Sequence, residues 1–258
     1  MSNTGFKADG AERIFPDALH PIILAIDTSS PEASLSISSA ENIIATLTVR
    51  DNRPHSQTLF SQIATLMQLA RVNIQDVSAF AISSGPGSFT GLRVGLAAVK
   101  GLADSMNKPC LGVNSLDLLA LASGSNGAHL LIIGAGRDEI YCGFRDLSSG
   151  DIVGGSIADM VGEPSSVLRI MRQYFSRSPL IMTVDWRYAY KDEVLDLILQ
   201  IQTDLTGASG LQPAILIPRL NISAVLAQRA ALLIKENRIT PLKPHYIRQS
   251  DAEIKWKR

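Results

Sequence analysis

The chain has 258 residues, 46% of them hydrophobic and 19% charged, and this length fits one large domain or two of about 100–150 residues each. Its 24 Lys and Arg residues balance its 24 Asp and Glu residues, which disfavours a protein that holds nucleic acid by itself, and its two cysteines do not form a disulfide framework. Since no apolar run reaches the roughly 20 residues that a membrane helix needs, we expect a cytoplasmic protein that makes no membrane contact.

The first predicted elements are three strands. A wholly apolar strand at residues 22–26 ends at Asp27, and further strands follow at residues 33–38 and 43–49. Serines and apolar residues alternate in the second strand, which is typical of a strand with one face in water. Residues 1–20 are polar and mixed in charge, and we expect them to form a disordered extension.

Two helices and the strands that follow them complete the predicted first lobe, residues 21–114. One helix spans residues 55–69, and after a strand at 77–83 a glycine-rich loop leads into a second helix at about 90–106. A short strand at residues 109–113 then ends this lobe.

The second predicted lobe, residues 115–258, alternates strands and helices in the same way. Its predicted strands are 129–135, 139–144 and 180–184, and its predicted helices are 115–122, 165–174, 192–200 and 221–236. Residues 150–155 contain three glycines and predict a flexible loop. The last helix and the tail after it could also pack back on the first lobe, so the boundary near Asn114 leaves their place open.

The turn after the first strand, Asp27-Thr28-Ser29, is one candidate functional site. An acidic residue at the end of a buried strand, followed by small hydroxyl residues, can hold a nucleotide through its carboxylate, hydroxyls and backbone N–H groups. The same residues also suit a structural turn, in which Asp27 accepts a hydrogen bond from the backbone two residues on. The sequence leaves both interpretations open.

The glycine-rich segment at residues 83–95 is the second candidate. Glycines before a helix resemble a phosphate-binding loop, but the lysine of that motif and the dinucleotide fingerprint are both missing. Gly91, Gly95 and Ala98 recur at helical spacing, so they form a strip without bulk that lets another helix come close. That helix could belong to the same chain or to another subunit.

The partner-interface interpretation takes in both predicted helices of the first lobe. If it is right, a bulky residue at Gly95 should weaken association without unfolding the lobe. The predicted interface comprises Leu59, Ile63, Met67, Phe89, Gly91, Leu92, Gly95, Leu96, Ala98 and Val99.

Residues suited to metal or nucleophile chemistry do not form known motifs in this sequence. The four histidines lack helical ligand spacing, and neither a Cys-x-x-Cys pair nor a Gly-x-Ser-x-Gly elbow occurs. We therefore predict no metal site and no catalytic residue. Cys110 and Cys142 lie in apolar, strand-like surroundings, and we expect both to be buried thiols.

Several segments, in their order along the chain, resemble the TsaB (YeaZ) family, whose members belong to the bacterial machinery that makes threonylcarbamoyladenosine in tRNA. The most specific match is residues 85–95, Gly-Pro-Gly-Ser-Phe-Thr-Gly-Leu-Arg-Val-Gly. The other matching segments are residues 23–29, 55–57, 112–116 and 246–248. The resemblance covers about residues 21–248.

The resemblance implies an actin-like (Hsp70-like) α/β fold of two lobes, each with a mixed sheet flanked by helices. It implies a non-catalytic subunit that activates a TsaD-like catalytic partner, the enzyme that acts on the adenosine beside the anticodon. The helices at residues 57–71 and 90–106 would hold that partner and would form a homodimer in isolation. A TsaE-like ATPase and tRNA would join through the complex. The chain would need no cofactor of its own, with ATP or ADP at the partner interface left open.

One segment departs from the family pattern. At residues 133–141 the family often has Ile-Asp-Ala-Arg-Arg-Gly-Glu-Val-Tyr, whereas Gly134 and Gly136 replace the aspartate and one arginine here. Two other functions stay open: an ATP-hydrolysing actin-like enzyme that uses Asp27 and Thr28, and a glycoprotease-like peptidase. The first of these needs a second aspartate in the second lobe, near the place where Gly134 stands.

Overall fold

Two units make up the fold of the chain. The computed structural model describes residues 6–8, 11–13, 20–136, 138–155, 158–171, 180–189, 192–209, 214–218, 221–239 and 242–247. Unit 1 comprises Met1–Ser115 and Leu220–His245, and unit 2 comprises Leu116–Arg219 and Tyr246–Arg258. The predicted boundary near Asn114 lies next to the observed boundary between Ser115 and Leu116. The closing helix, which the sequence assigned to the second lobe or folded back on the first, belongs to unit 1.

The N-terminal region is described only in part. Within the predicted extension, residues 1–20, the structure describes His20 and two short antiparallel strands, β1 (Phe6–Ala8) and β2 (Ala11–Arg13). The rest of that prediction lies outside the described residues.

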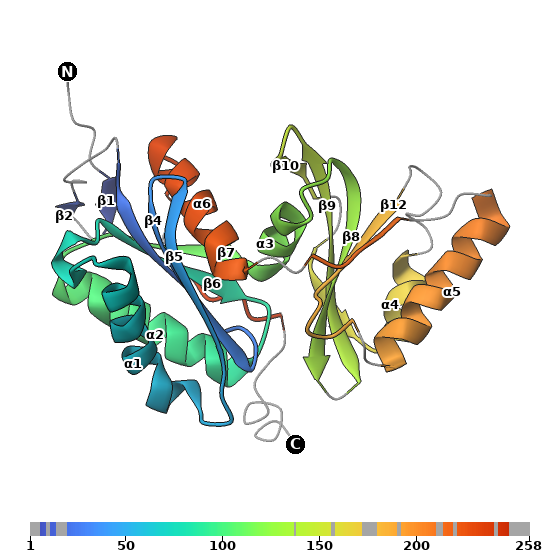
Figure 1. Cartoon of the computed structure of the whole chain (residues 1–258). Helices are drawn as coiled ribbons and strands as arrows, with labels where there is room; N and C mark the ends of the chain where they lie inside the picture. The colour runs from blue at the N-terminus through green and yellow to red at the C-terminus, as the bar shows by residue number, and fades with distance from the viewer. Residues whose placement is uncertain are drawn as a thin grey trace. The chain divides into compact units, whose positions relative to one another are not determined.

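Unit 1 is built on a five-stranded mixed sheet (Figure 1). Its strands, in spatial order, are β5 (Asn42–Arg50), β4 (Glu32–Ser39), β3 (Ile22–Asp27), β6 (Ala79–Gly85) and β7 (Cys110–Asn114). Strands β5, β4 and β3 run antiparallel because short turns join them, and β3, β6 and β7 run parallel because helical connections return the chain.

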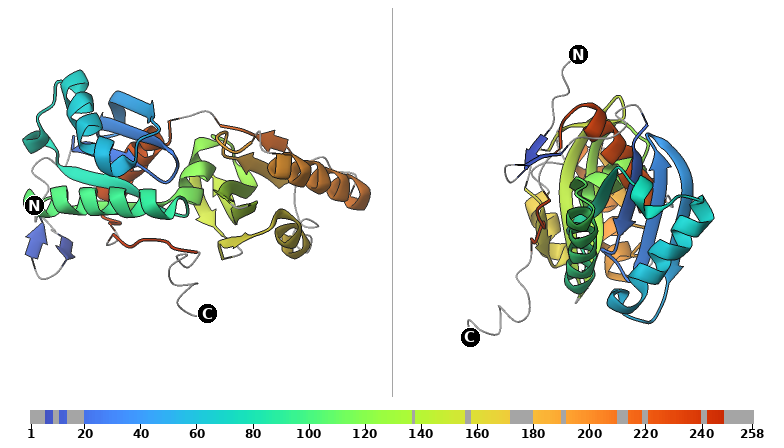
Figure 2. Two further views of the ribbon diagram at one scale, coloured as in Figure 1. Left: turned by 90° about the horizontal axis from the view of Figure 1, so that it is seen from below. Right: turned by 90° about the vertical axis from the view of Figure 1, so that its left-hand side faces the viewer.

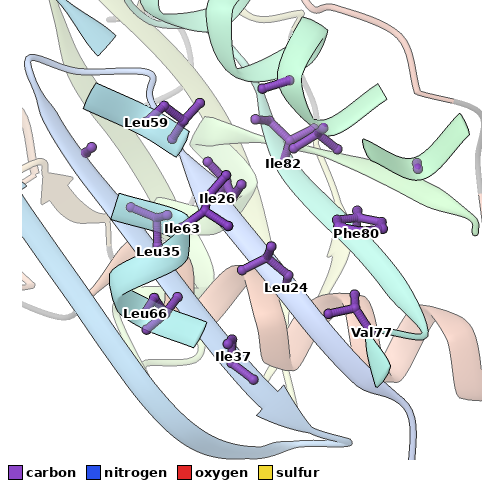
Figure 3. Close-up of a cluster of buried hydrophobic side chains, with 14 of the residues drawn as sticks. Leu24, Ile26, Leu35, Ile37, Leu59, Ile63, Leu66, Val77, Phe80 and Ile82 are labelled. Carbon is purple, nitrogen blue, oxygen red and sulfur yellow. The ribbon is translucent and has the colours of Figure 1, made fainter. Parts of the chain in front are cut away.

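Helices cover both faces of this sheet (Figures 1 and 2). α1 (His55–Ala70) and α2 (Phe89–Ser105) lie on one face, with the short 3-10 turn η1 (Ile74–Asp76) after α1, and α6 (Ile222–Lys235) lies on the other. The main core fills the space between the sheet and α1 and α2. Its members include Leu24, Ile26, Leu35, Ile37, Leu59, Ile63, Leu66, Val77, Phe80 and Ile82 (Figure 3).

The second strand of unit 1 differs from its prediction. The apolar residues of β4 face the core as expected, but Ser34 and Ser36 on the opposite side are also buried. The Ser36 and Ser223 hydroxyl oxygens lie 2.6 Å apart, and the oxygens of Ser34 and Ser223 lie 2.8 Å apart, where α6 begins. Serine alternation therefore marks a face covered by a helix through hydroxyl pairs, not a face in water.

Unit 2 repeats the arrangement of unit 1. Its main strands, in spatial order, are β10 (Asp151–Gly154), β9 (Glu139–Ser148), β8 (Gly127–Gly136), β12 (Leu180–Val184) and β13 (Ala214–Leu216), and β11 (Met160–Gly162) pairs with β9. Its helices are α3 (Ser115–Ala122), α4 (Pro164–Met171) and α5 (Asp192–Ser209). The predicted flexible loop at residues 150–155 is wrong, because most of it forms β10.

Both sheets place an antiparallel meander beside parallel strands. When β11 is set aside, each sheet has the spatial order third, second, first, fourth, fifth along the chain. The predicted fold class, two α/β lobes with mixed sheets flanked by helices, is confirmed. Within the described residues, no helix is both long and apolar enough to cross a membrane.

Candidate functional site

Strand β3 ends at Asp27, the acidic residue of the predicted nucleotide turn. Asp27 is fully buried, and its Oδ1 accepts hydrogen bonds from the Ser29 N–H (3.0 Å) and from the Ser83 hydroxyl on β6. The bond from Ser29 closes an Asx turn. Asp27 therefore has the structural role that the sequence left open, since it joins β3, its turn and β6.

The rest of the turn is held by the glycine-rich segment. The Thr28 hydroxyl donates to the Gly91 carbonyl oxygen (2.8 Å), and the Ser88 N–H donates to the Ser29 carbonyl oxygen (2.6 Å). Ser88 also begins α2, because its hydroxyl accepts from the Gly91 N–H at 3.3 Å. One short segment thus caps a helix and fixes the turn of a neighbouring strand.

Glycine is required at the contact between α2 and this turn. A Cβ added at Gly91 would come within 3.0 Å of the Thr28 carbonyl oxygen, and one at Gly95 would come within 3.0 Å of Thr28 Oγ1 and Ile82 Cδ1. Real Cβ atoms do not approach so closely, so these positions have no room for a side chain. The prediction that Gly91 and Gly95 face another subunit is therefore wrong, because they face the chain's own turn.

Most of the other predicted interface residues lie in the core of unit 1. The buried ones are Leu59, Ile63, Met67, Leu92, Leu96, Ala98 and Val99, none of them more than 9% exposed. Phe89 is half-buried at the start of α2, with the Arg93 guanidinium 3.9 Å from the centre of its ring. The apolar stripes of α1 and α2 pack on the sheet, as those of amphipathic helices normally do. These stripes are not an available surface.

A different set of residues forms the outer face of α1 and α2. Phe60 on α1 is 60% exposed, and Ala64, one turn further along, is exposed on the same side of the helix. Ala97 and Gly101 on α2 are exposed too, and nothing lies within 4 Å of the place that a Gly101 side chain would take. We call these four residues the outer face. An exposed phenylalanine beside small residues on two helices is suited to contact with another protein.

The sequence analysis did not include the outer face in the predicted interface, for a specific reason. Phe60, Ala64 and Met67 widen the apolar stripe of α1 beyond the width that a core-facing seam needs, and that excess was the available signal. The spacing of Gly91 and Gly95 drew attention to the opposite side of α2. Periodicity finds the faces of a helix, but it does not say which of two faces is covered.

The residues of the predicted nucleotide turn do not fit a nucleotide in unit 1. The Asp27 carboxylate and the Thr28 hydroxyl both have internal partners. A Cβ at Gly87 would lie 2.5 Å from the Ser29 carbonyl oxygen, so the glycine-rich loop rests directly on the turn. A phosphate cradle needs backbone N–H groups that point into open space. We therefore assign no step to ATP or ADP at this turn.

The corresponding strand end in unit 2 is also filled. Gly134 lies near the end of β8, and a Cβ there would come within 3.0 Å of the Tyr188 ring, which lies beyond β12. Asp185 follows β12 and forms a two-point ion pair with Arg187, in which the Nε–Oδ1 distance is 2.9 Å. The end of β8 thus carries a glycine, Gly134, that the Tyr188 ring covers.

The described residues contain no group of three or more His, Cys, Asp or Glu side chains that could hold a metal ion. Neither Cys110 nor Cys142 forms a disulfide. Cys142 is buried, and burial raises the pKa of its thiol to about 12. Cys110 is only half-buried, so the expectation of two buried thiols holds for Cys142 alone.

Comparisons of sequence agree on one family. A family model described as TsaD, tRNA N6-adenosine threonylcarbamoyltransferase, matches residues 43–256. The tRNA threonylcarbamoyladenosine biosynthesis protein TsaB of Bacillus subtilis is 26% identical over 250 residues, which cover 91% of this chain and 97% of that protein. The TsaB protein of Escherichia coli is 30% identical over 156 residues, which cover 58% of this chain and 66% of that protein.

Comparison of structures supports the fold. YeaZ from Pseudomonas aeruginosa superimposes with a TM-score of 0.66 at 22% sequence identity, over 88% of this chain and 99% of that one. At this level of identity the likeness concerns the fold alone.

Proposed function

The chain belongs to the TsaB (YeaZ) family, within the wider TsaD family, and we propose that it is a non-catalytic, activating subunit of the complex that forms N6-threonylcarbamoyladenosine in tRNA. The observation that carries the proposal is the match to a TsaB protein over nearly the full length of both chains. The outer face of α1 and α2 supports it, because exposed Phe60 beside the small residues of the two helices suits a subunit that works in contact with another.

The proposed catalytic partner is a TsaD-like protein that docks on the outer face. Alone, the chain would pair with a second copy through the same face, so that homodimer and complex compete. A TsaE-like ATPase and the tRNA would join the assembled complex, with tRNA held mainly by the other subunits. The balanced charge of this chain agrees with a minor role in holding tRNA.

The proposal is tested by reconstitution with the TsaD-like protein. The mass of the mixture is measured by light scattering during gel filtration, and transfer of labelled threonine to tRNA is measured with and without this chain. We expect a stable complex and transfer that depends on it. If no complex forms and transfer proceeds equally without the chain, the proposed function is wrong.

The docking face is tested by a matched pair of substitutions at one exposed position. Gly101→Leu adds bulk where a partner helix would approach, and we expect it to weaken the complex at least about tenfold, or about 1.4 kcal/mol. Gly101→Ala adds only one methyl group and should leave the affinity nearly unchanged. Circular dichroism should be native for both variants, since no atom lies within 4 Å of the new Cβ.

We assign any need for ATP or ADP to the partner side of the complex. The internal hydrogen bonds of Asp27 and Thr28 support this assignment. Calorimetric titration of the isolated chain with ATP and Mg²⁺ should therefore give no binding heat, whereas the assembled complex could bind. Tight binding with turnover by the isolated chain would instead favour the actin-like ATPase.

A further inference from the structure

Asn126 is the only asparagine in the sequence that precedes a glycine, and it lies in the turn between α3 and β8. Asparagine is thermally labile, because the backbone nitrogen of the next residue can attack its side-chain amide and close a succinimide ring. Such an attack gains from proximity, and a glycine offers no side chain to hinder it. Asn126 and Gly127 are both exposed, so unit 2 presents this reactive pair to water.

A second turn holds the side-chain amide of Asn126. The Gly150 N–H donates to Asn126 Oδ1 at 3.1 Å. Ser149 and Gly150 form the two-residue turn between β9 and β10, with φ values of 52° and 77°, as in a type I′ hairpin turn. Asn126 therefore links the entry of β8 to the β9–β10 hairpin.

The backbone is fixed on both sides of Asn126. The Ser125 carbonyl oxygen lies 3.0 Å from Nε2 of buried His129, and Gly127 begins β8, where it pairs with Leu147 of β9. Gly127 has a φ of 124°, a conformation that favours glycine. The reactive pair thus lies in an anchored segment with a hydrogen-bond donor on the oxygen of the group under attack.

We propose that Asn126 is a site of spontaneous deamidation and isoaspartate formation, and that the Gly150 N–H promotes the attack. The Gly127 nitrogen bonds to Asn126 Cγ and gives up its proton to solvent. Negative charge develops on Oδ1, where a fixed N–H donor stabilises it as an oxyanion hole does. The Cγ–Nδ2 bond then breaks, and the NH₂ group takes a proton from solvent and leaves as ammonia.

Water opens the succinimide in two ways, and the two products differ in their backbone. Attack at Cγ gives aspartate with the ordinary chain. Attack at the backbone carbonyl carbon gives isoaspartate, in which the chain runs through Cβ and Cγ and gains a carbon atom. The oxygen that accepts from Gly150 then belongs to this longer backbone, between the anchored Ser125 and the start of β8. We therefore expect isoaspartate to release the Gly150 turn.

The modification is tested on the purified full-length chain, kept folded or unfolded in guanidinium chloride, at neutral and at mildly alkaline pH. Peptide mapping by mass spectrometry locates the exchange of NH₂ for OH, and isoaspartyl methyltransferase with labelled S-adenosylmethionine measures isoaspartate. We expect the folded chain to convert Asn126 at least as fast as the unfolded chain, because of the Gly150 donor. Alkaline pH should speed the reaction, since the attacking nitrogen loses a proton. Asn126→Gln must close a larger ring and should lose the reaction.

Release of the turn is tested by hydrogen exchange of the peptide that contains Ser149 and Gly150. This peptide should exchange faster in the aged chain than in the fresh chain. Asn126→Asp is the matched control, because it has a carboxylate oxygen for the Gly150 N–H and a backbone of ordinary length. It should stay as protected as the fresh wild-type chain.

Three results would contradict the inference. If the unfolded chain converts Asn126 and the folded chain keeps it intact, the Gly150 bond protects the side chain and the proposal is wrong. If the folded chain is modified at other asparagines instead, the assignment to Asn126 is wrong. If the aged chain and Asn126→Asp exchange alike, the release of the turn is wrong. No partner protein enters these measurements, so they are independent of the proposed function.

Discussion

Units 1 and 2 share a strand order, but they build the same close contact in opposite ways. In both, the end of the first strand meets the segment that follows the fourth. In unit 1 the strand end keeps a side chain, Thr28, and the next helix makes room with Gly91 and Gly95. In unit 2 the strand end is bare, at Gly134, and the following loop supplies the ring of Tyr188.

This exchange shows that a packed contact constrains the sum of two volumes rather than each residue separately. Gly134 departs from the aspartate that the family often has there, and taken alone it suggests a lost function. Beside Tyr188 it is one half of a compensating pair. The departure therefore says more about packing in unit 2 than about chemistry.

The strongest test of this comparison is a substitution in unit 1, at Gly95. Gly95→Leu would drive its Cβ into Thr28 and Ile82, and we expect a loss of about 3 kcal/mol or more in the free energy of unfolding. The sequence analysis expected the opposite, namely that a bulky residue at Gly95 weakens association and does not unfold the lobe. Gly101→Ala on the same helix has open space and should gain about 0.5–1 kcal/mol.

Urea unfolding followed by circular dichroism measures both variants. A Gly95→Leu protein as stable as the wild type would mean that α2 does not rest on the β3 turn. Unit 1 would then lack the close contact that the comparison with unit 2 assumes.

The second test introduces the residue of the family pattern into unit 2. Gly134→Asp would place a Cβ against the Tyr188 ring, and we expect a loss of about 1–3 kcal/mol, since the half-buried ring can partly move aside. Tyr188→Ala should restore part of that loss, so the double variant should be more stable than the sum of the single effects predicts. Hydrogen exchange of β8 and β12 peptides measures the effect, and strict additivity would mean that the two residues do not share the contact.

The same comparison explains what the sequence could reveal. Apolar runs and helical periods identified the main strands and helices of both units, because burial on one or both faces leaves a local signature. The strands β10, β11 and β13 were missed, since each has only three or four residues, too few to show a period.

The roles of the candidate functional residues depend on contacts between distant parts of the chain, and the sequence predicted them less well. The motif at residues 85–95 identified the family, but which side of α2 faces the sheet depends on Thr28, more than 60 positions away. Likewise, the buried serine face of β4 depends on α6, a helix from the far end of the chain. Contacts between distant segments decide such roles, and the period of a single helix or strand does not contain them.

The smallest effect that we expect is a difference between the two units in how their stability depends on pH. His129 on β8 is fully buried in unit 2, with Nε2 3.0 Å from the Ser125 carbonyl oxygen and Nδ1 2.9 Å from the Thr183 hydroxyl. A carbonyl oxygen only accepts, so Nε2 carries the proton of the neutral ring. Burial lowers the pKa of His129, although the bond to Ser125 and the charge of Asp146 oppose that shift.

The direction of the pH effect follows from proton binding. Below the ordinary histidine pKa of about 6.5, the unfolded chain binds a proton that folded His129 resists, so unit 2 loses stability as pH falls from about 7.5 to 5.5. The contribution is complete above about pH 7.5, where the unfolded histidine is neutral too. Among the described histidines of unit 1, His20 is exposed and His55 and His245 are half-buried, so exchange of β4 amides should change less than exchange of β8 amides. His129→Gln should flatten the difference between the units, and a difference that survives this substitution would place the acid sensitivity elsewhere in unit 2.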